Sequence, residues 1–212
     1  MITIVDYGIG NLRSIEKAFE AVGAEPERTD DPAVITEAER LVVPGVGAFG
    51  ACIDEIRRRD LEQPILDFAA SGRPFLGVCV GMQLLFEESE ERGRHEGLGL
   101  LPGRIVRFDS DSAGANGTPL TVPHMGWNTI EPQRDSPFLA DLTSKAYFYF
   151  VHSFYARPDR DDDVLAATPY GHPFPAVVGR NNVFGVQFHP EKSHRNGLRV
   201  LKNFASLSTT AT

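Results

Sequence analysis

The first ninety residues alternate between strand-like and helix-like hydrophobic patterns. Residues 2–6 form an apolar, β-branched run, and in residues 12–23 apolar side chains recur at helical spacing up to a glycine. The same order returns twice, with strand-like runs at 41–43 and 74–78 and helical stretches at 50–71 and 80–90. Strands that alternate with helices predict a mostly parallel sheet with helices on both faces, which binds ligands at the carboxyl ends of its strands.

The second half of the chain has shorter strand-like runs, separated by Pro, Gly, Asn and Asp clusters. These runs lie at 104–108, 128–130, 146–155, 164–168, 176–180 and 183–188. They predict antiparallel or mixed strands added to the sheet, with a mobile loop at 109–119 and a last helix at 194–207. We therefore expect one domain over residues 1–208 and a short tail at 209–212.

Composition excludes several classes of protein. The chain of 212 residues has a formal net charge of -8 and no clustered Lys/Arg stripe, which argues against nucleic-acid binding. It has no run of about 18 apolar residues and no basic leader, so we expect no membrane span, no signal peptide and a cytoplasmic location. Two cysteines without CxxC spacing indicate reduced thiols, and no metal or cofactor is expected.

One of these cysteines, Cys79, lies in the pattern Gly77-x-Cys79-x-Gly81 between an apolar run and a helical one. This is the form of a nucleophile elbow, in which small neighbours permit a strained turn that exposes the nucleophile at a helix N-terminus. The backbone N–H of Val80 would point toward an oxyanion formed on the attacked group. The alternative is that Cys79 is a small buried hydrophobe.

The best candidate base among the six histidines is His189. It ends an apolar strand and precedes Pro190, which favours an extended backbone and brings the side chains of residues 189 and 191 to the same side. Glu191 would then orient the imidazole and stabilise its cation. Taken alone, the same tripeptide is most often a turn.

The glycine-rich segment 44–50 follows another strand-like run. Its glycines, around Gly45-Val46-Gly47, allow a peptide to present its N–H as a second oxyanion donor, although a plain turn explains them as well. It is not a P-loop, because no Gly-Lys-Ser/Thr follows, and residues 7–14 lack the last glycine of a dinucleotide fingerprint.

Taken in order, ITIVDYGIGN, PGVG, GVCVGMQLLF and GVQFHPEKS resemble the class I glutamine amidotransferases. Together with HMGWN they are typical of the branch that forms the glutaminase subunits of imidazole glycerol phosphate synthases. The resemblance runs from Met1 to about Leu207 and implies the flavodoxin-like class I glutaminase fold. One departure is Val80, where the family usually has leucine; only its backbone N–H is needed, so we expect no effect on the mechanism.

The resemblance also implies an activity, the hydrolysis of L-glutamine to glutamate and ammonia through a cysteinyl thioester. Cys79 would be the nucleophile, His189 the acid and base, and Glu191 its orienting partner. The backbone of Val80 and of Gly45, Val46 and Gly47 would hold the oxyanion, and Gln83 would help to bind glutamine.

The resemblance further implies a partner, a (β/α)₈-barrel cyclase that forms a heterodimer with the glutaminase. The cyclase uses the ammonia to form imidazole glycerol phosphate and aminoimidazole carboxamide ribotide in histidine biosynthesis. The residues expected at this interface are His124, Trp127, Asn128, Tyr149 and Lys192. Four alternatives remain: the glutaminase of another amidotransferase pathway, a stand-alone γ-glutamyl hydrolase, a non-catalytic binding or scaffold module and a redox-sensing cysteine protein.

Overall fold

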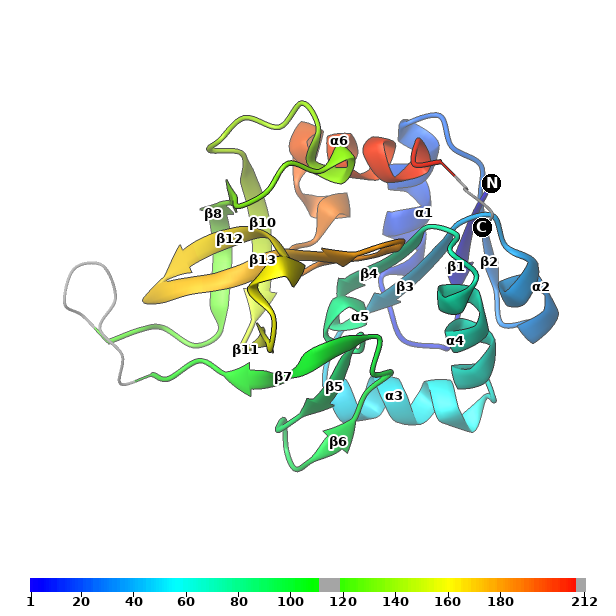
Figure 1. Cartoon of the computed structure of the whole chain (residues 1–212), viewed down its shortest axis with the longest axis horizontal. Helices are drawn as coiled ribbons and strands as arrows, with labels where there is room; N and C mark the ends of the chain where they lie inside the picture. Colours follow the sequence, from blue (N-terminus) through cyan, green and yellow to red (C-terminus); the bar gives the residue numbers. More distant parts are fainter. Residues whose placement is uncertain (111–118, 209–212) are drawn as a thin grey trace.

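The computed structural model describes residues 1–110 and 119–208, and its centre is a sheet with the strand order β2-β1-β3-β4-β14-β13-β12-β9 (Figure 1). Strands β2, β1, β3, β4 and β14 run parallel, and β13, β12 and β9 continue the sheet antiparallel. Their bounds are β1 Ile2–Val5, β2 Pro26–Thr29, β3 Leu41–Gly45, β4 Phe75–Cys79, β9 Glu131–Pro132, β12 Val164–Tyr170, β13 His172–Arg180 and β14 Val183–Val186. The predicted fold class is confirmed.

Helices cover both faces of this sheet. Figure 1 shows α1 (Leu12–Ala21) and α6 (His194–Ala205) together on one face, with α3 (Phe49–Arg58) and α4 (Glu62–Ala70) on the other. The short α2 (Pro32–Glu37) packs against α4. Because both faces are covered, β3 and β4 are buried along their whole length.

Two smaller sheets extend from this core. Strands β8 (His124–Thr129) and β10 (Tyr147–His152) form an antiparallel pair, which we call the β8–β10 ribbon. The other sheet has the order β11-β7-β5-β6, with β11 Phe154–Pro158, β7 Leu101–Arg107, β5 Phe86–Ser89 and β6 His95–Glu96. One face of the ribbon is buried, while the other exposes large apolar side chains such as Trp127 and Tyr147.

Several sequence predictions need correction. The helix expected at 80–90 is a single turn, α5 (Val80–Gln83), followed by β5, because residues 86–89 pair with β7 and with β6. The stretch 50–71 is two helices, since the chain turns through Asp60 at φ 57°. Strand β2 and helix α2 were not expected, and the run 146–155 divides at Ser153 into β10 and β11. Most of the predicted 109–119 loop, and the tail, lie outside the described residues.

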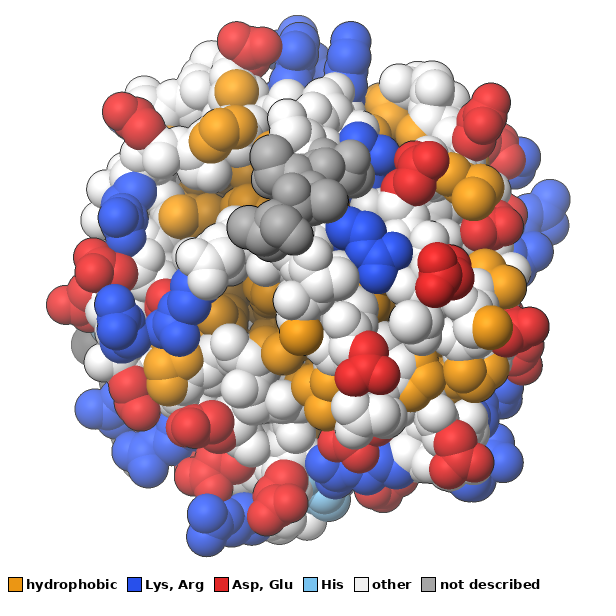
Figure 2. Space-filling view, turned by 45° about the vertical axis from the view of Figure 1, so that its right-hand side comes forward, with side chains coloured by type: hydrophobic (Ala, Val, Ile, Leu, Met, Phe, Trp, Pro, Cys, Tyr) orange, Lys and Arg blue, Asp and Glu red, His pale blue; other side chains and the backbone are white. Residues whose placement is uncertain are grey.

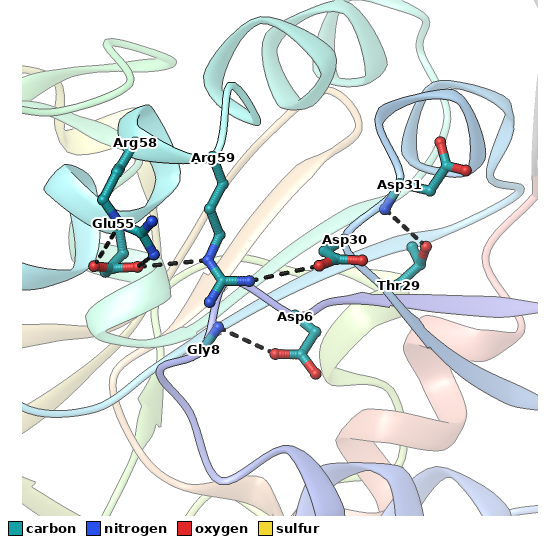
Figure 3. A network of polar contacts seen from close by, with 8 residues as sticks. All are labelled: Asp6, Gly8, Thr29, Asp30, Asp31, Glu55, Arg58 and Arg59. Carbon is teal, nitrogen blue, oxygen red and sulfur yellow. Dashed lines mark hydrogen bonds and ion pairs between the residues drawn. The ribbon is translucent and has the colours of Figure 1, made fainter.

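A polar network fixes the turn that follows β1 (Figure 3). The Arg59 guanidinium lies 3.5 Å from carboxylate oxygens of Glu55 and of Asp30, and the Gly8 N–H donates to Asp6 Oδ1 at 3.1 Å. Gly8 has φ 85°, a conformation that favours glycine, and its lack of a Cβ leaves room for Arg59 Nη2, which would lie 2.7 Å from a Cβ at this position. The turn directs Tyr7 into the core, where its hydroxyl donates to the carbonyl oxygen of Pro44 at 2.5 Å.

Charged side chains are mixed over the surface, and the face in Figure 2 shows acidic and basic groups interspersed. Within residues 1–110 and 119–208, none of the helices has the length and apolarity needed to cross a bilayer.

Candidate active site

The turn at Cys79 is as sharp as the sequence predicted. Cys79 ends β4 with φ 56° and ψ -111°, a strained conformation for a residue with a Cβ. A Cβ on Gly77 would lie 2.4 Å from Gly81 O, and one on Gly81 would lie 1.9 Å from Val43 O. Both glycines are therefore required for the chain to fold back at this point.

The helix after Cys79 contributes less than expected. Because α5 has only four residues, the aligned peptide dipoles that a long helix would direct at the sulfur are few. The imidazole of His189 lines the same cavity as Cys79, and the interaction between the two side chains raises the pKa of His189. The sequence predicted this pair, and the structure brings the two residues together from β4 and from the turn after β14 (residues 183–186).

The imidazole of His189 also contacts a carboxylate. Its Nδ1 lies 2.9 Å from Glu191 Oε1, which leaves Nε2 for Cys79. His189 has the extended backbone expected before a proline, with φ -96° and ψ 99°. Cys79, His189 and Glu191 are all almost fully buried. The arrangement has the connectivity of a nucleophile, a base and an orienting acid.

Electrostatics favour the charged forms of both His189 and Glu191. Burial opposes charge on His189, but its hydrogen bonds to Cys79 and Glu191 dominate and raise its pKa above the ordinary value. Burial likewise opposes charge on Glu191, yet the hydrogen bonds with His189 and Asn11 hold its pKa below the usual range. A protonated imidazole stabilises a thiolate beside it, and thiolate is the reactive form of cysteine.

Asn11 is a site residue that the sequence analysis missed. Its Nδ2 donates to Glu191 Oε1 at 3.3 Å, across a separation of 180 residues. Asn11 occupies the N-cap position of α1, but its side chain makes no capping hydrogen bond. An asparagine ahead of a helix normally signals a cap, so nothing local in the sequence pointed to the carboxylate.

The turn that carries His189 and Glu191 is anchored on β10. The His189 N–H donates to the Tyr149 carbonyl at 2.9 Å. The buried Ser193 hydroxyl donates to the His189 carbonyl at 2.6 Å and accepts from the Tyr149 N–H at 3.0 Å. The β8–β10 ribbon therefore fixes the position of the histidine backbone.

The glycine-rich end of β3 lies beside the elbow. Gly45 pairs with Cys79, and a Cβ on it would lie 2.7 Å from Gly81 N. Tyr7 holds the carbonyl before Gly45, and the Cys52 thiol donates to the Val46 carbonyl at 3.5 Å. Burial raises the pKa of Cys52 to about 11, so it remains a thiol and a donor. The carbonyls on both sides of the Gly45–Val46 peptide are thus anchored.

A cavity of 410 Å³ opens over Cys79. Its walls come from the end of β3, from the elbow and α5, from the junction of β10 and β11, and from the turn after β14. The lining residues are Val46, Gly47, Cys79, Val80, Gln83, Glu91, Pro123, Val151, His152, Ser153, Phe154, His189 and Lys192. A small polar molecule in this cavity would contact both the sulfur and the candidate oxyanion donors.

The residues predicted at a partner interface are only partly on the surface. Trp127 is 46% exposed and stacks on His194 with ring centroids 5.0 Å apart. Tyr149 lies beside Trp127, and Lys192 Nζ lies 5.7 Å from the Tyr149 ring centroid. Asn128 donates to the Pro169 carbonyl at 2.9 Å.

His124 is only 3% exposed, so it would act at a partner interface through its neighbours and not by direct contact. It belongs to a buried histidine pair with defined tautomers. His152 Nδ1 lies 2.8 Å from the Phe154 carbonyl, which only accepts, so this nitrogen carries the proton. His152 Nε2 must then accept from His124 Nδ1, at 3.1 Å. Burial lowers the pKa of His124 to about 4 and that of His152 to about 3.

The histidine pair predicts a loss of stability in mild acid. Both pKa values lie below the ordinary value of about 6.5 in the unfolded chain. The unfolded state therefore binds more protons once the pH falls below about 6.5, and stability declines toward pH 4. We expect the free energy of unfolding, from urea titrations between pH 7 and 5, to fall by about 2 kcal/mol per pH unit below pH 6. His124→Asn should roughly halve the slope, and an unchanged slope would contradict this assignment.

Comparisons with known proteins agree with this geometry. The family model described as "Glutamine amidotransferase class-I" matches residues 3–207. A protein of Salinibacter ruber named "Imidazole glycerol phosphate synthase subunit HisH" is 67% identical over 210 residues, which cover 99% of this chain and 96% of that protein. A protein of the same name from Syntrophotalea carbinolica is 53% identical over 207 residues, 98% of this chain and 100% of that one.

Solved structures show the same fold at low identity. "Structure of PurLQS from Thermotoga maritima" matches with a TM-score of 0.73 at 21% identity, over 96% of both chains. A structure described as a glutamine amidotransferase matches with a TM-score of 0.72 at 19% identity, over 97% of this chain and 99% of that chain. The chain belongs to the class I glutamine amidotransferase family, in which relatives at up to 67% identity are subunits named HisH.

Proposed function

We propose that this protein is the glutaminase subunit of an imidazole glycerol phosphate synthase. In this proposal it hydrolyses glutamine to glutamate and ammonia, and it delivers the ammonia to a cyclase subunit. The observation that carries the proposal is the strained Cys79 elbow with the His189–Glu191 pair beside it. A glutaminase of amino-acid biosynthesis would work in the cytoplasm, where we propose that the protein acts.

The reaction begins with the Cys79 thiolate, which attacks the side-chain carboxamide carbon of glutamine. The negative charge moves to the carboxamide oxygen, where the N–H of Val80 and one from the Gly45–Gly47 backbone stabilise it. His189 donates its proton to the amide nitrogen, so the C–N bond breaks and ammonia leaves a glutamyl thioester. His189 then takes a proton from water, the hydroxide attacks the thioester, and glutamate and the thiolate are released.

A partner is needed because ammonia released by this chain alone would diffuse away. We propose that the partner is a (β/α)₈-barrel cyclase and that it binds the outer face of the β8–β10 ribbon. Trp127 and Met125 are exposed there and Tyr149 is half-buried, and exposed aromatic side chains commonly anchor protein interfaces. Lys192 lies next to Tyr149 and lines the cavity, so a docked partner would cover the entrance to the site.

The same geometry supports regulation by the partner. The peptide between Gly45 and Val46 lies at the end of β3, between the Pro44 and Val46 carbonyls, and a rotation of this peptide would leave the hydrogen bonds of both carbonyls in place. We propose that the isolated subunit is a poor glutaminase because this N–H does not face the oxyanion until the partner and its ligand are bound. A free subunit as fast as the complex would contradict this part of the proposal.

The experiment that tests the function is glutamate release from glutamine by the purified chain. Glutamate release is measured for the chain alone, for the chain with the cyclase subunit, and for the chain with the cyclase and its ribotide ligand. We expect slow release alone and strong release in the full complex, together with formation of imidazole glycerol phosphate. If the complex is inactive with this cyclase, the partner assignment is wrong and another amidotransferase pathway has to be tested.

Trp127→Ala is expected to weaken binding of the cyclase about 30-fold, because truncation of a central aromatic anchor costs roughly 2 kcal/mol. Trp127 packs on Tyr149 and His194 and contributes little to the core, so the folded structure should persist. Binding is measured by isothermal titration calorimetry. The control is Arg94→Ala in the β5–β6 turn, whose side chain is 82% exposed. Equal affinities for both variants would place the interface elsewhere.

A further inference from the structure

Two buried side-chain amides lie beside the sulfur of Cys79. Gln83 is on α5 and Gln187 follows β14, and their exposed fractions are 3% and 0%. Gln83 Nε2 lies 3.1 Å from Gln187 Oε1, and Gln187 Nε2 lies 3.9 Å from Cys79 Sγ. Buried amides need hydrogen-bond partners, so the orientation of one amide determines which atom its neighbour must present.

The orientation of both amides follows from one backbone carbonyl. The Phe154 oxygen lies 3.1 Å from the Gln83 amide and can only accept, so the Gln83 nitrogen must face it. The second hydrogen of this nitrogen then goes to Gln187, which must present its oxygen. Gln187 is left with its NH₂ group directed at Cys79. Only this orientation of the two amides satisfies all three contacts, with the Phe154 carbonyl, between the two glutamines, and with Cys79.

The Phe154 carbonyl is itself held from the opposite side. It also accepts a hydrogen bond from His152 Nδ1, and His152 is fixed in turn by His124. His124 Nε2 accepts from Asn128 Nδ2 at 3.3 Å. Two series of hydrogen bonds therefore meet at the Phe154 carbonyl, which accepts from both. One comes from Asn128 on the β8–β10 ribbon through the histidine pair, and the other comes from Gln83, which also orients Gln187.

We propose that Gln187 is a catalytic residue that donates a hydrogen bond to the thiolate of Cys79, and that Gln83 and the Phe154 carbonyl orient it. This inference rests on the proposed glutaminase function and adds a donor to the triad. A hydrogen bond to a charged acceptor is stronger than one to a neutral acceptor, so Gln187 stabilises the thiolate more than the thiol.

The test measures the reactivity of the sulfur directly. Alkylation of Cys79 by iodoacetamide is followed by mass spectrometry from pH 5 to 10, in the full-length protein without glutamine or partner. Gln187→Met keeps the side-chain volume and removes the donor. We expect its alkylation rate at pH 7 to fall about tenfold and the midpoint of the pH profile to move up by about one unit, as for a thiolate that loses one donor.

The matched control is Thr168→Val on β12. Thr168 is also fully buried, and its hydroxyl has no hydrogen-bond partner among the described residues. This substitution tests a change in a buried polar side chain without touching the site, and its pH profile should equal that of the wild type. A second variant, Gln83→Met, keeps the donor but removes its orienting partner, so a smaller shift in the same direction is expected.

The inference is overturned if Gln187→Met is folded and its alkylation rate has the same pH profile as that of the wild type. Thermal unfolding shows whether the variant is folded. If this variant does not fold, Gln83→Met decides by the same criterion. Glutamate release by the wild type in the presence of the cyclase is measured in parallel. Wild-type protein that releases no glutamate while Gln187→Met shifts the profile would refute the proposed function and retain the Gln187–Cys79 contact.

Discussion

Cys79→Ala is expected to lower glutamate release by the complex at least about 10³-fold, because covalent catalysis is lost with the sulfur. Alanine keeps the Cβ, so the positive φ at this position and the packing of the elbow stay as they are. The substitution therefore removes the nucleophile without relieving the strained backbone. Release is measured with saturating glutamine, with the cyclase and its ribotide ligand present.

Cys52→Ala is the matched control for this prediction. Cys52 is the other cysteine and is fully buried, and its thiol donates to the Val46 carbonyl and lies near Tyr7. A modest loss of activity is expected, since removal of one weak hydrogen bond shifts the adjacent peptide but leaves the nucleophile in place. If Cys79→Ala retained activity while Cys52→Ala lost it, the nucleophile would have been assigned to the wrong cysteine.

The local geometry of the site could be predicted from the sequence because it is coded by neighbours. Gly77 and Gly81 flank Cys79, and each glycine is required by a backbone contact within the same turn or with β3. Pro190 likewise fixes the extended backbone of His189. The contact between Gly77 and Gly81 and the effect of Pro190 on His189 act within four residues, so a short motif shows them, whereas the contact of Gly81 with Val43 joins the elbow to β3.

The remaining contacts could not be predicted because they join distant segments. Asn11 follows β1 and Glu191 follows β14, so the two residues meet only because these two strands belong to the same sheet. The prediction that the helix continues beyond Gln83 was wrong for a related reason. The apolar and acidic run there fits helical spacing, but pairing with β7, which follows later in the chain, makes residues 86–89 a strand.

The β8–β10 ribbon joins the two parts of the proposed function. Its outer face carries Trp127 and Tyr149, while the Tyr149 backbone holds both the N–H of His189 and the hydroxyl of Ser193. A partner that shifts this ribbon also shifts the backbone of His189. Coupling between a docking surface and the active site therefore needs no long path through the core.

Glu191→Gln is expected to lower the turnover of the complex about 100-fold while leaving the imidazole in place. Replacing the carboxylate of a serine-protease triad by an amide costs about 10⁴-fold, mainly because the histidine takes the wrong tautomer. Here Asn11 donates to the same Oε1 that contacts His189, so a glutamine at 191 keeps its oxygen at that position. The tautomer is preserved, and only the negative charge is lost.

Loss of the carboxylate charge can be distinguished from loss of the correct His189 tautomer by measurement. Without the carboxylate charge the pKa of His189 falls, because the interaction with Glu191 is one cause of its elevation. Turnover of Glu191→Gln is therefore expected to have an altered pH profile, whereas Asn11→Ala alone should lower turnover only a few-fold. In the double variant the amide at 191 is free to turn its nitrogen toward His189, and the loss should exceed the product of the two single losses. Simple multiplicative losses would show that Asn11 does not hold the orientation of residue 191, and that its contact with the carboxylate is incidental to catalysis.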